Sequence, residues 1–183
     1  MPSKKFTLAT LLATALVYFL LDALNRALFP SAALAGGESW IYLPAGLQLA
    51  FILIFLGTGA AGVTLASCAI GLVHFSGMDP VTVLGAGLIS GFSPWLARLI
   101  CLEKFKLDQQ LHQLNQAALV KIALTFAALH AVMLQLWLSW SDPAIPFIEA
   151  AAKLFIADLL GTFILLYIAK YLIGLMPAPE QIK

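Results

Sequence analysis

The sequence predicts an all-α membrane protein, a compact bundle of about six transmembrane helices. Of its 183 residues, 62% are hydrophobic and only 10% are charged, and the mean hydropathy is +0.97. Soluble domains do not have this composition. Apolar stretches long enough to cross about 30 Å of hydrocarbon recur along the chain, with short connections between them. We therefore expect one transmembrane domain over residues 1–183.

Each predicted span rests on an apolar run bounded by polar or turn-forming residues. Only Gly57, Thr58 and Gly59 separate the second span from the third, which predicts a tight turn between two antiparallel helices. The connection 103–117 spaces its leucines as on one face of a helix and is predicted to lie on the cytoplasmic interface or to dock a partner there. The six predicted spans cover residues 7–28, 40–57, 59–76, 80–102, 118–140 and 147–175.

The distribution of basic residues predicts that both ends of the chain lie in the cytoplasm. With six spans and an inside N-terminus, the outer side holds only Arg26 and Lys153. Positive charge accumulates on the cytoplasmic side of membrane proteins, so this N-in, C-in orientation is favoured. The remaining basic residues fall on the inner side: Lys4, Lys5, Arg98, Lys104, Lys106, Lys121, Lys170 and Lys183.

The N-terminus also has features of a secretory signal, because Lys4 and Lys5 precede an apolar run and residues 33–35 read Ala-Leu-Ala. Asp22 and Arg26 lie between that run and the supposed cleavage site, which is longer and more charged than such sites usually are. We predict that the first helix is retained. Cleavage before Gly36 is the alternative.

Several functional classes find no support in the sequence. Cys68 and Cys101 lie in different spans and are predicted to be small buried residues, with neither a disulfide nor a metal site. No H-E-x-x-H motif or deep pair of carboxylates at helical spacing is present, so we expect no enzyme, metal or cofactor. No basic face of a soluble domain indicates nucleic-acid binding.

Charged and polar side chains inside the predicted spans mark the candidate site. Asp22 and Arg26 are four residues apart and are predicted to form a structural pair. Asp158 is the deepest carboxylate, and His130 is similarly deep in the preceding span. A charge at a helix centre costs on the order of 3 kcal/mol unless it is compensated, so Asp158 is a ligand-site or proton-site candidate, with His130 beside it.

The stretch ESWIYLPAGLQLAFILIF places Pro44 and Gly46 where a plain helix would have leucines. One interpretation is that a helix begins at Pro44, just below an aromatic pair. The other is that Pro44 kinks the helix at the mouth of a pocket that contains Gln48. In the fourth span, Gly87 and Gly91 form a G-x-x-x-G pair that is predicted to let another helix approach closely.

Two motifs resemble the bacterial membrane-associated sensor (MASE) family. SWIYLPAGLQLAFILIFLGTGAAGVTLASCAIG is similar to its opening motif, and FIADLLGTFIL is similar to its closing Asp-x-x-Gly. The matching residues are Pro44, Gly46 and Gly57 in the first motif and Asp158 and Gly161 in the second. Together the motifs cover roughly a quarter of the chain.

The resemblance implies a sensory or ligand-binding module of the bacterial inner membrane. Members of that family commonly have about eight helices and an attached output domain, whereas this sequence has six predicted spans. It would therefore act through a separate signalling partner or a second copy. The alternative is a transporter component. The chain resembles the substrate-binding subunit of energy-coupling-factor transporters in its size and its short loops. The sequence leaves the ligand open.

Overall fold

The computed structural model describes residues 4–29, 39–75, 77–105 and 116–174. Every regular element in these ranges is an α-helix, and five helices are long and apolar enough to cross a membrane. The chain is therefore an all-α, multi-pass membrane protein. Its helices are α1 (Lys4–Leu28), α2 (Leu43–His74), α3 (Pro80–Phe105), α4 (Gln116–Ser141) and α5 (Phe147–Gly174).

The predicted count of six helices is not supported, because the second and third predicted spans belong to one helix. α2 extends through Gly57, Thr58 and Gly59, and the residue inside it with non-helical dihedral angles is Leu56 (φ 54°, ψ −131°). The reorientation is therefore concentrated at one residue, and a three-residue loop does not form. A Cβ atom on Gly59 would collide with the backbone carbonyl of Phe51, which shows how closely the chain folds back there.

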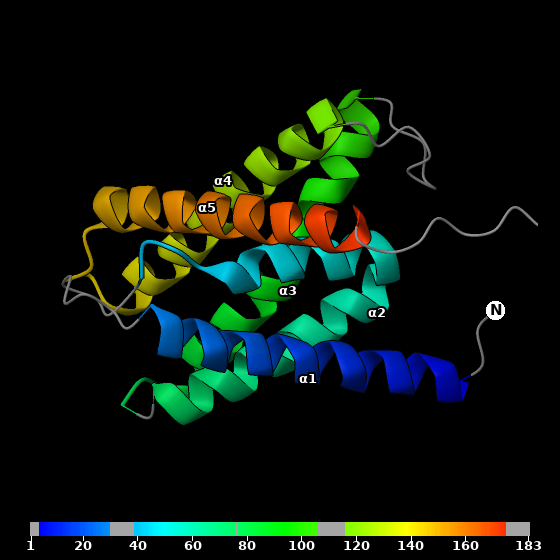
Figure 1. Cartoon of the computed structure of the whole chain (residues 1–183). Helices are drawn as coiled ribbons and strands as arrows, with labels where there is room; N and C mark the ends of the chain where they lie inside the picture. The colour runs from blue at the N-terminus through cyan, green and yellow to red at the C-terminus, as the bar shows by residue number, and fades with distance from the viewer. Residues whose placement is uncertain (1–3, 30–38, 76, 106–115, 175–183) are drawn as a thin grey trace, which may run out of the picture.

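The bend at Leu56 gives α2 two arms (Figure 1). The first arm runs toward the right of the view and the second returns toward the lower left. At 1.5 Å per residue, the first arm, residues 43–55, is about 20 Å long and the second, residues 57–74, is about 27 Å long. The first arm is thus shorter than the hydrocarbon core of a bilayer.

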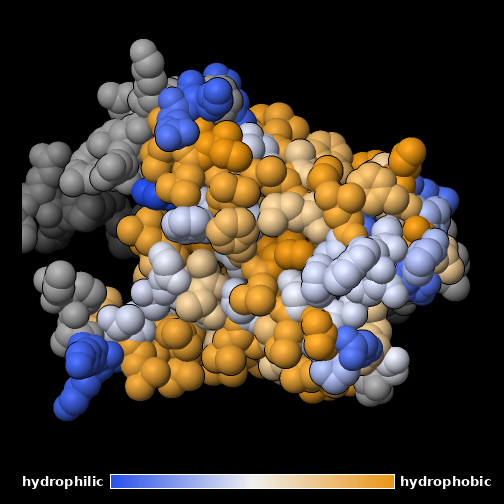
Figure 2. Space-filling model, turned by 180° about the vertical axis from the view of Figure 1, so that it is seen from behind, coloured by the Kyte–Doolittle hydropathy of each residue, from blue (hydrophilic) through white to orange (hydrophobic). Residues whose placement is uncertain are grey.

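α2 is the central element of the bundle, since it packs against α1, α3 and α5, while α4 packs against α3 and α5. One buried apolar cluster joins α2, α3 and α4 around Leu49, Ile122 and Phe126. A second joins α1 to both arms of α2 around Tyr18 and Val63. The outer faces carry exposed leucines, and hydrophobic residues cover most of the face seen in Figure 2, with hydrophilic residues toward its edges.

Glycines on α3 lie where this helix approaches α2 closely. A Cβ atom on Gly87 would collide with Cys68, and one on Gly91 would collide with Thr64, both on the second arm of α2. This is the kind of contact predicted for the G-x-x-x-G pair. Cys68 and Cys101 are free thiols.

Two sequence predictions fall largely outside the described residues. Most of the amphipathic connection 103–117 lies there, and so does the Ala-Leu-Ala triplet at residues 33–35. The interfacial helix and the retention of the first helix therefore remain predictions.

Candidate functional site

The start of α2 answers the question raised by Pro44. The proline occupies the first turn of the helix, where its missing N–H group has no intrahelical partner to lose. Of the two interpretations, the helix start is the one observed, and the kink of α2 lies twelve residues later at Leu56. Pro44 is buried rather than placed at the mouth of a pocket.

The non-helical segment before Pro44 obtains its hydrogen bonds from neighbouring helices. Asn25 of α1 accepts a hydrogen bond from the backbone N–H of Leu43 (2.9 Å) and donates one to the carbonyl of Ile41 (3.3 Å). The N–H of Tyr42 donates to the carbonyl of Ala157 on α5 (3.1 Å). Irregular backbone at membrane depth is tolerated only where protein groups satisfy it in this way.

Two glycines bring the start of α2 against the middle of α5. A Cβ atom on Gly161 would collide with the carbonyl of Tyr42. A Cβ atom on Gly46 would lie 2.8 Å from Cβ of Leu165 and 3.0 Å from Cα of Thr162. α2 therefore begins beside the centre of α5, well inside the bundle.

Next to this segment, α4 and α5 form a buried polar pair. The Nδ1 atom of His130 lies 2.7 Å from Oδ2 of Asp158, and the two residues are 2% and 0% exposed. The ring of Phe126 stacks on His130 with 5.7 Å between centroids. In a neutral imidazole whose Nδ1–H donates to the carboxylate, Nε2 of His130 is an acceptor.

Four buried atoms on these two helices have no hydrogen-bond partner in the structure: Nε2 of His130, Oε1 of Gln135, Oδ1 of Asp158 and Oγ1 of Thr162. Thr162 lies one turn after Asp158 on α5, so the two share a face. Buried polar atoms are normally paired, and a group left unpaired costs about 1–3 kcal/mol. A ligand that donates hydrogen bonds would satisfy the unpaired atoms of Asp158, of its partner His130 and of Thr162 one turn away.

A second polar cluster, on α1 and the start of α2, includes residues that sequence analysis missed. Asp22 binds Arg26 with 2.8 Å between Oδ2 and Nε, as the predicted pair requires. The hydroxyl of Tyr42 donates to Asp22 (3.4 Å) and is 2.9 Å from the hydroxyl of Tyr18. Gln48 donates to Tyr18 (2.7 Å).

The predicted ligand-site residues thus separate into two groups. His130 and Asp158 contact each other, whereas Gln48 contacts Tyr18 and leaves its Oε1 atom unpaired. The residues of the second polar cluster could have been identified from helical spacing. Tyr18, Asp22 and Asn25 lie four and three residues apart and so share the buried face of α1.

Among the residues that the structure describes, no group of three histidine, cysteine or acidic side chains comes together to hold a metal. The helices and the buried site define the class: a multi-pass α-helical membrane protein with a polar centre. Comparisons of the chain with protein-family models, with curated proteins and with solved structures found no match.

Proposed function

We propose that this protein is a ligand-binding or sensory module of the bacterial inner membrane that acts through a separate partner. The observation that carries the proposal is the buried His130–Asp158 pair beside the irregular segment that enters α2. Titratable groups buried at membrane depth are costly and are usually kept for function. Helices that begin inside the membrane are a recurring feature of ligand sites in transporters.

The ligand is a small polar molecule that donates hydrogen bonds, such as an amine. The unpaired atoms at this centre can all accept hydrogen bonds: Oδ1 of Asp158, Nε2 of a neutral His130 and Oγ1 of Thr162, whose hydroxyl can also donate. A donor placed among them would satisfy atoms that otherwise remain desolvated. The carboxylate would also attract a positive charge in this low-dielectric setting.

The resemblance to membrane-associated sensors supports the sensory role at the residues just described. Gly46 and Gly161 bring the opening and closing motifs together, and Asp158 lies beside that contact. Members of that family signal through an output domain, so we infer that a separate signalling protein or a second copy reads the state of the bundle.

We further propose that the chain crosses the membrane six times with both ends in the cytoplasm, because α2 doubles back at Leu56. Figure 1 supports this, since the Lys4 end of α1 and the Gly174 end of α5 lie toward the same side. With six crossings and an inside N-terminus, the described basic residues on the inner side are Lys4, Lys5, Arg98, Lys104, Lys121 and Lys170, and those on the outer side are Arg26 and Lys153.

The test is a ligand screen on the purified full-length protein. Small amines and other polar metabolites are added at millimolar concentration, and a binder present at 100 times its Kd should stabilise the protein by about 2.7 kcal/mol. Asp158→Asn should fold and insert but should no longer be stabilised by the ligand. Asp22→Asn should lower the stability of the protein and should still be stabilised by the ligand.

The proposed site would be refuted if Asp158→Leu were more heat-stable than the wild type and still responded to the same compounds. Uptake of a radiolabelled hit into proteoliposomes and cells separates the transporter alternative from a sensor. Accumulation that depends on the protein would favour the transporter, and binding without accumulation would favour the sensor.

A further inference from the structure

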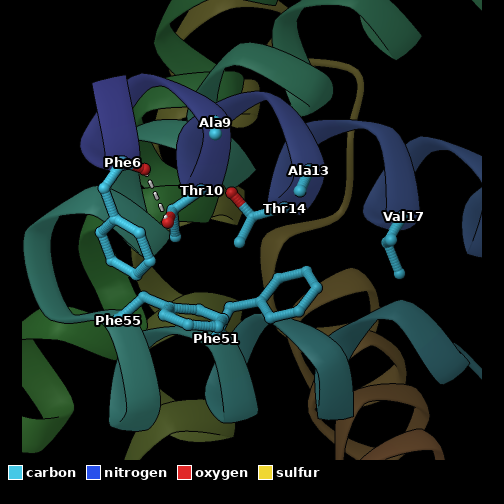
Figure 3. A pocket seen from close by; sticks show the side chains of 8 residues that line it. All are labelled: Phe6, Ala9, Thr10, Ala13, Thr14, Val17, Phe51 and Phe55. Atoms are coloured by element: carbon cyan, nitrogen blue, oxygen red, sulfur yellow. Dashed lines mark hydrogen bonds between the residues drawn. The ribbon is translucent and has the colours of Figure 1, made fainter. Parts of the chain in front are cut away.

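An apolar groove of about 440 Å³ lies between α1 and the first arm of α2, on the outside of the bundle (Figure 3). One wall is the face of α1 from Phe6 to Val17, and the other is formed by Phe51 and Phe55. The wall on α1 is smooth because Ala9 and Ala13 lie there, whereas large leucines project from other faces of the same helix.

The groove is chemically apolar although two threonines line it. The hydroxyl of Thr10 donates to the carbonyl of Phe6, and that of Thr14 donates to the carbonyl of Leu11, each at 2.9 Å. Both hydroxyls are therefore satisfied within α1, and the groove offers hydrocarbon contacts along its length. It shares no residue with the His130–Asp158 site, so an occupant here is independent of the proposed function.

The length of the groove matches a single hydrocarbon chain. From Phe6 to Val17 the wall is about 16 Å long at 1.5 Å per residue, close to half of a hydrocarbon core of about 30 Å. One acyl chain of a phospholipid spans the same half of the core, so its length fits the groove.

The charge at one end of the groove indicates the headgroup. α1 begins at Lys4, and the exposed Lys4 and Lys5 directly precede Phe6, where the groove starts. Lysines at the end of a membrane helix reach the phosphate level of the bilayer and attract anionic lipids. We propose that this groove binds one acyl chain of an anionic phospholipid whose headgroup is held by Lys4 and Lys5.

Native mass spectrometry of the full-length protein with added phosphatidylglycerol or phosphatidylcholine tests the proposal. The wild type should retain one phosphatidylglycerol in preference to phosphatidylcholine. Lys4→Gln with Lys5→Gln should reduce that preference by about fivefold per lysine. The matched control, Lys104→Gln with Lys170→Gln, removes two exposed charges from other helices and should leave the preference unchanged.

The groove itself is tested by filling it. Ala9→Phe with Ala13→Phe should abolish retention of the lipid, whereas Leu8→Phe with Leu12→Phe, on exposed positions outside the groove, should not. Retention unchanged in the groove-filled variant would overturn the proposal.

A measurement on the wild-type protein tests the site even if these variants fail to fold. Phosphatidylglycerol with a photoreactive group in the acyl chain should label Phe51, Phe55 and the groove-lining face of α1. Labels spread evenly over the exposed leucines, or crosslinked dimers in place of lipid adducts, would refute the lipid site.

Discussion

At the residue scale, glycines decide how the polar centre is assembled. Gly161 has no side chain where the carbonyl of Tyr42 passes α5, and Gly46 has none where α2 meets Thr162 and Leu165. The same approach places the N–H of Tyr42 against the carbonyl of Ala157, next to Asp158. The two glycines therefore allow the entering segment to reach the depth of the buried carboxylate.

Gly161→Ala is expected to destabilise the protein by about 1–3 kcal/mol, because the added methyl group collides with backbone that cannot rotate away. Gly57→Ala is the matched control. A Cβ atom there meets nothing within 4 Å, and alanine favours helix over glycine by up to about 1 kcal/mol. Thermal unfolding of the purified proteins measures both, and equal midpoints would contradict the close contact.

At the scale of elements, the bend of α2 depends on one residue with an uncommon backbone conformation. Leu56 is the one non-glycine residue with positive φ in the described part of the chain, and its neighbour Gly57 does not carry the positive φ. A leucine in that region costs about 1–3 kcal/mol, which the packing of the two arms offsets. The bend follows from tertiary contacts more than from the glycines around it.

Leu56→Gly should therefore raise the thermal midpoint. Relief of about 1–3 kcal/mol of strain exceeds the flexibility cost of about 0.5–1 kcal/mol that glycine brings. Little burial is lost, since Leu56 is 46% exposed.

Leu65→Gly, at 50% exposure in the regular second arm, is the control and should lower stability by about 1 kcal/mol. If both substitutions lowered the midpoint equally, Leu56 would not be strained. Thermal unfolding followed by circular dichroism provides the comparison.

At the scale of the whole molecule, the proposed number of crossings determines where the two ends of the chain lie. If α2 crosses twice, the crossings number six and the ends share a side. If α2 crosses once, they number five and the ends lie on opposite sides. The shortness of the first arm, about 20 Å, does not prevent two crossings, because the four described residues before Leu43 can span about 10 Å more when extended.

Reporter fusions after Lys104 and Lys183 are expected to be cytoplasmic, and one at Asp142 periplasmic. A sequence with five crossings and the same N-terminus would instead place the fusion at Lys183 in the periplasm and the one at Asp142 in the cytoplasm. A cytoplasmic signal from both Lys183 and Asp142 would contradict either arrangement, because α5 lies between them.

Composition and periodicity alone determined the class of this protein. Apolar runs of membrane-spanning length need no knowledge of contacts, because lipid is the solvent for each of them separately. The pairing of Asp22 with Arg26 was also predictable, since residues four apart on one helix are neighbours in any tertiary structure. Asp158 and His130 were identifiable from the sequence because each lies deep within an apolar run.

Only the tertiary structure decided the partners. That His130 binds Asp158, that Asn25 caps the start of α2 and that Gln48 turns to Tyr18 depend on which helices are neighbours, which no single-helix pattern contains. The continuity of α2 was likewise undecidable from Gly57, Thr58 and Gly59, since a glycine turn and a one-residue bend satisfy the same local preferences. The packing of both arms against α1 and α3 selects the bend, because burial over whole helix faces outweighs local preference.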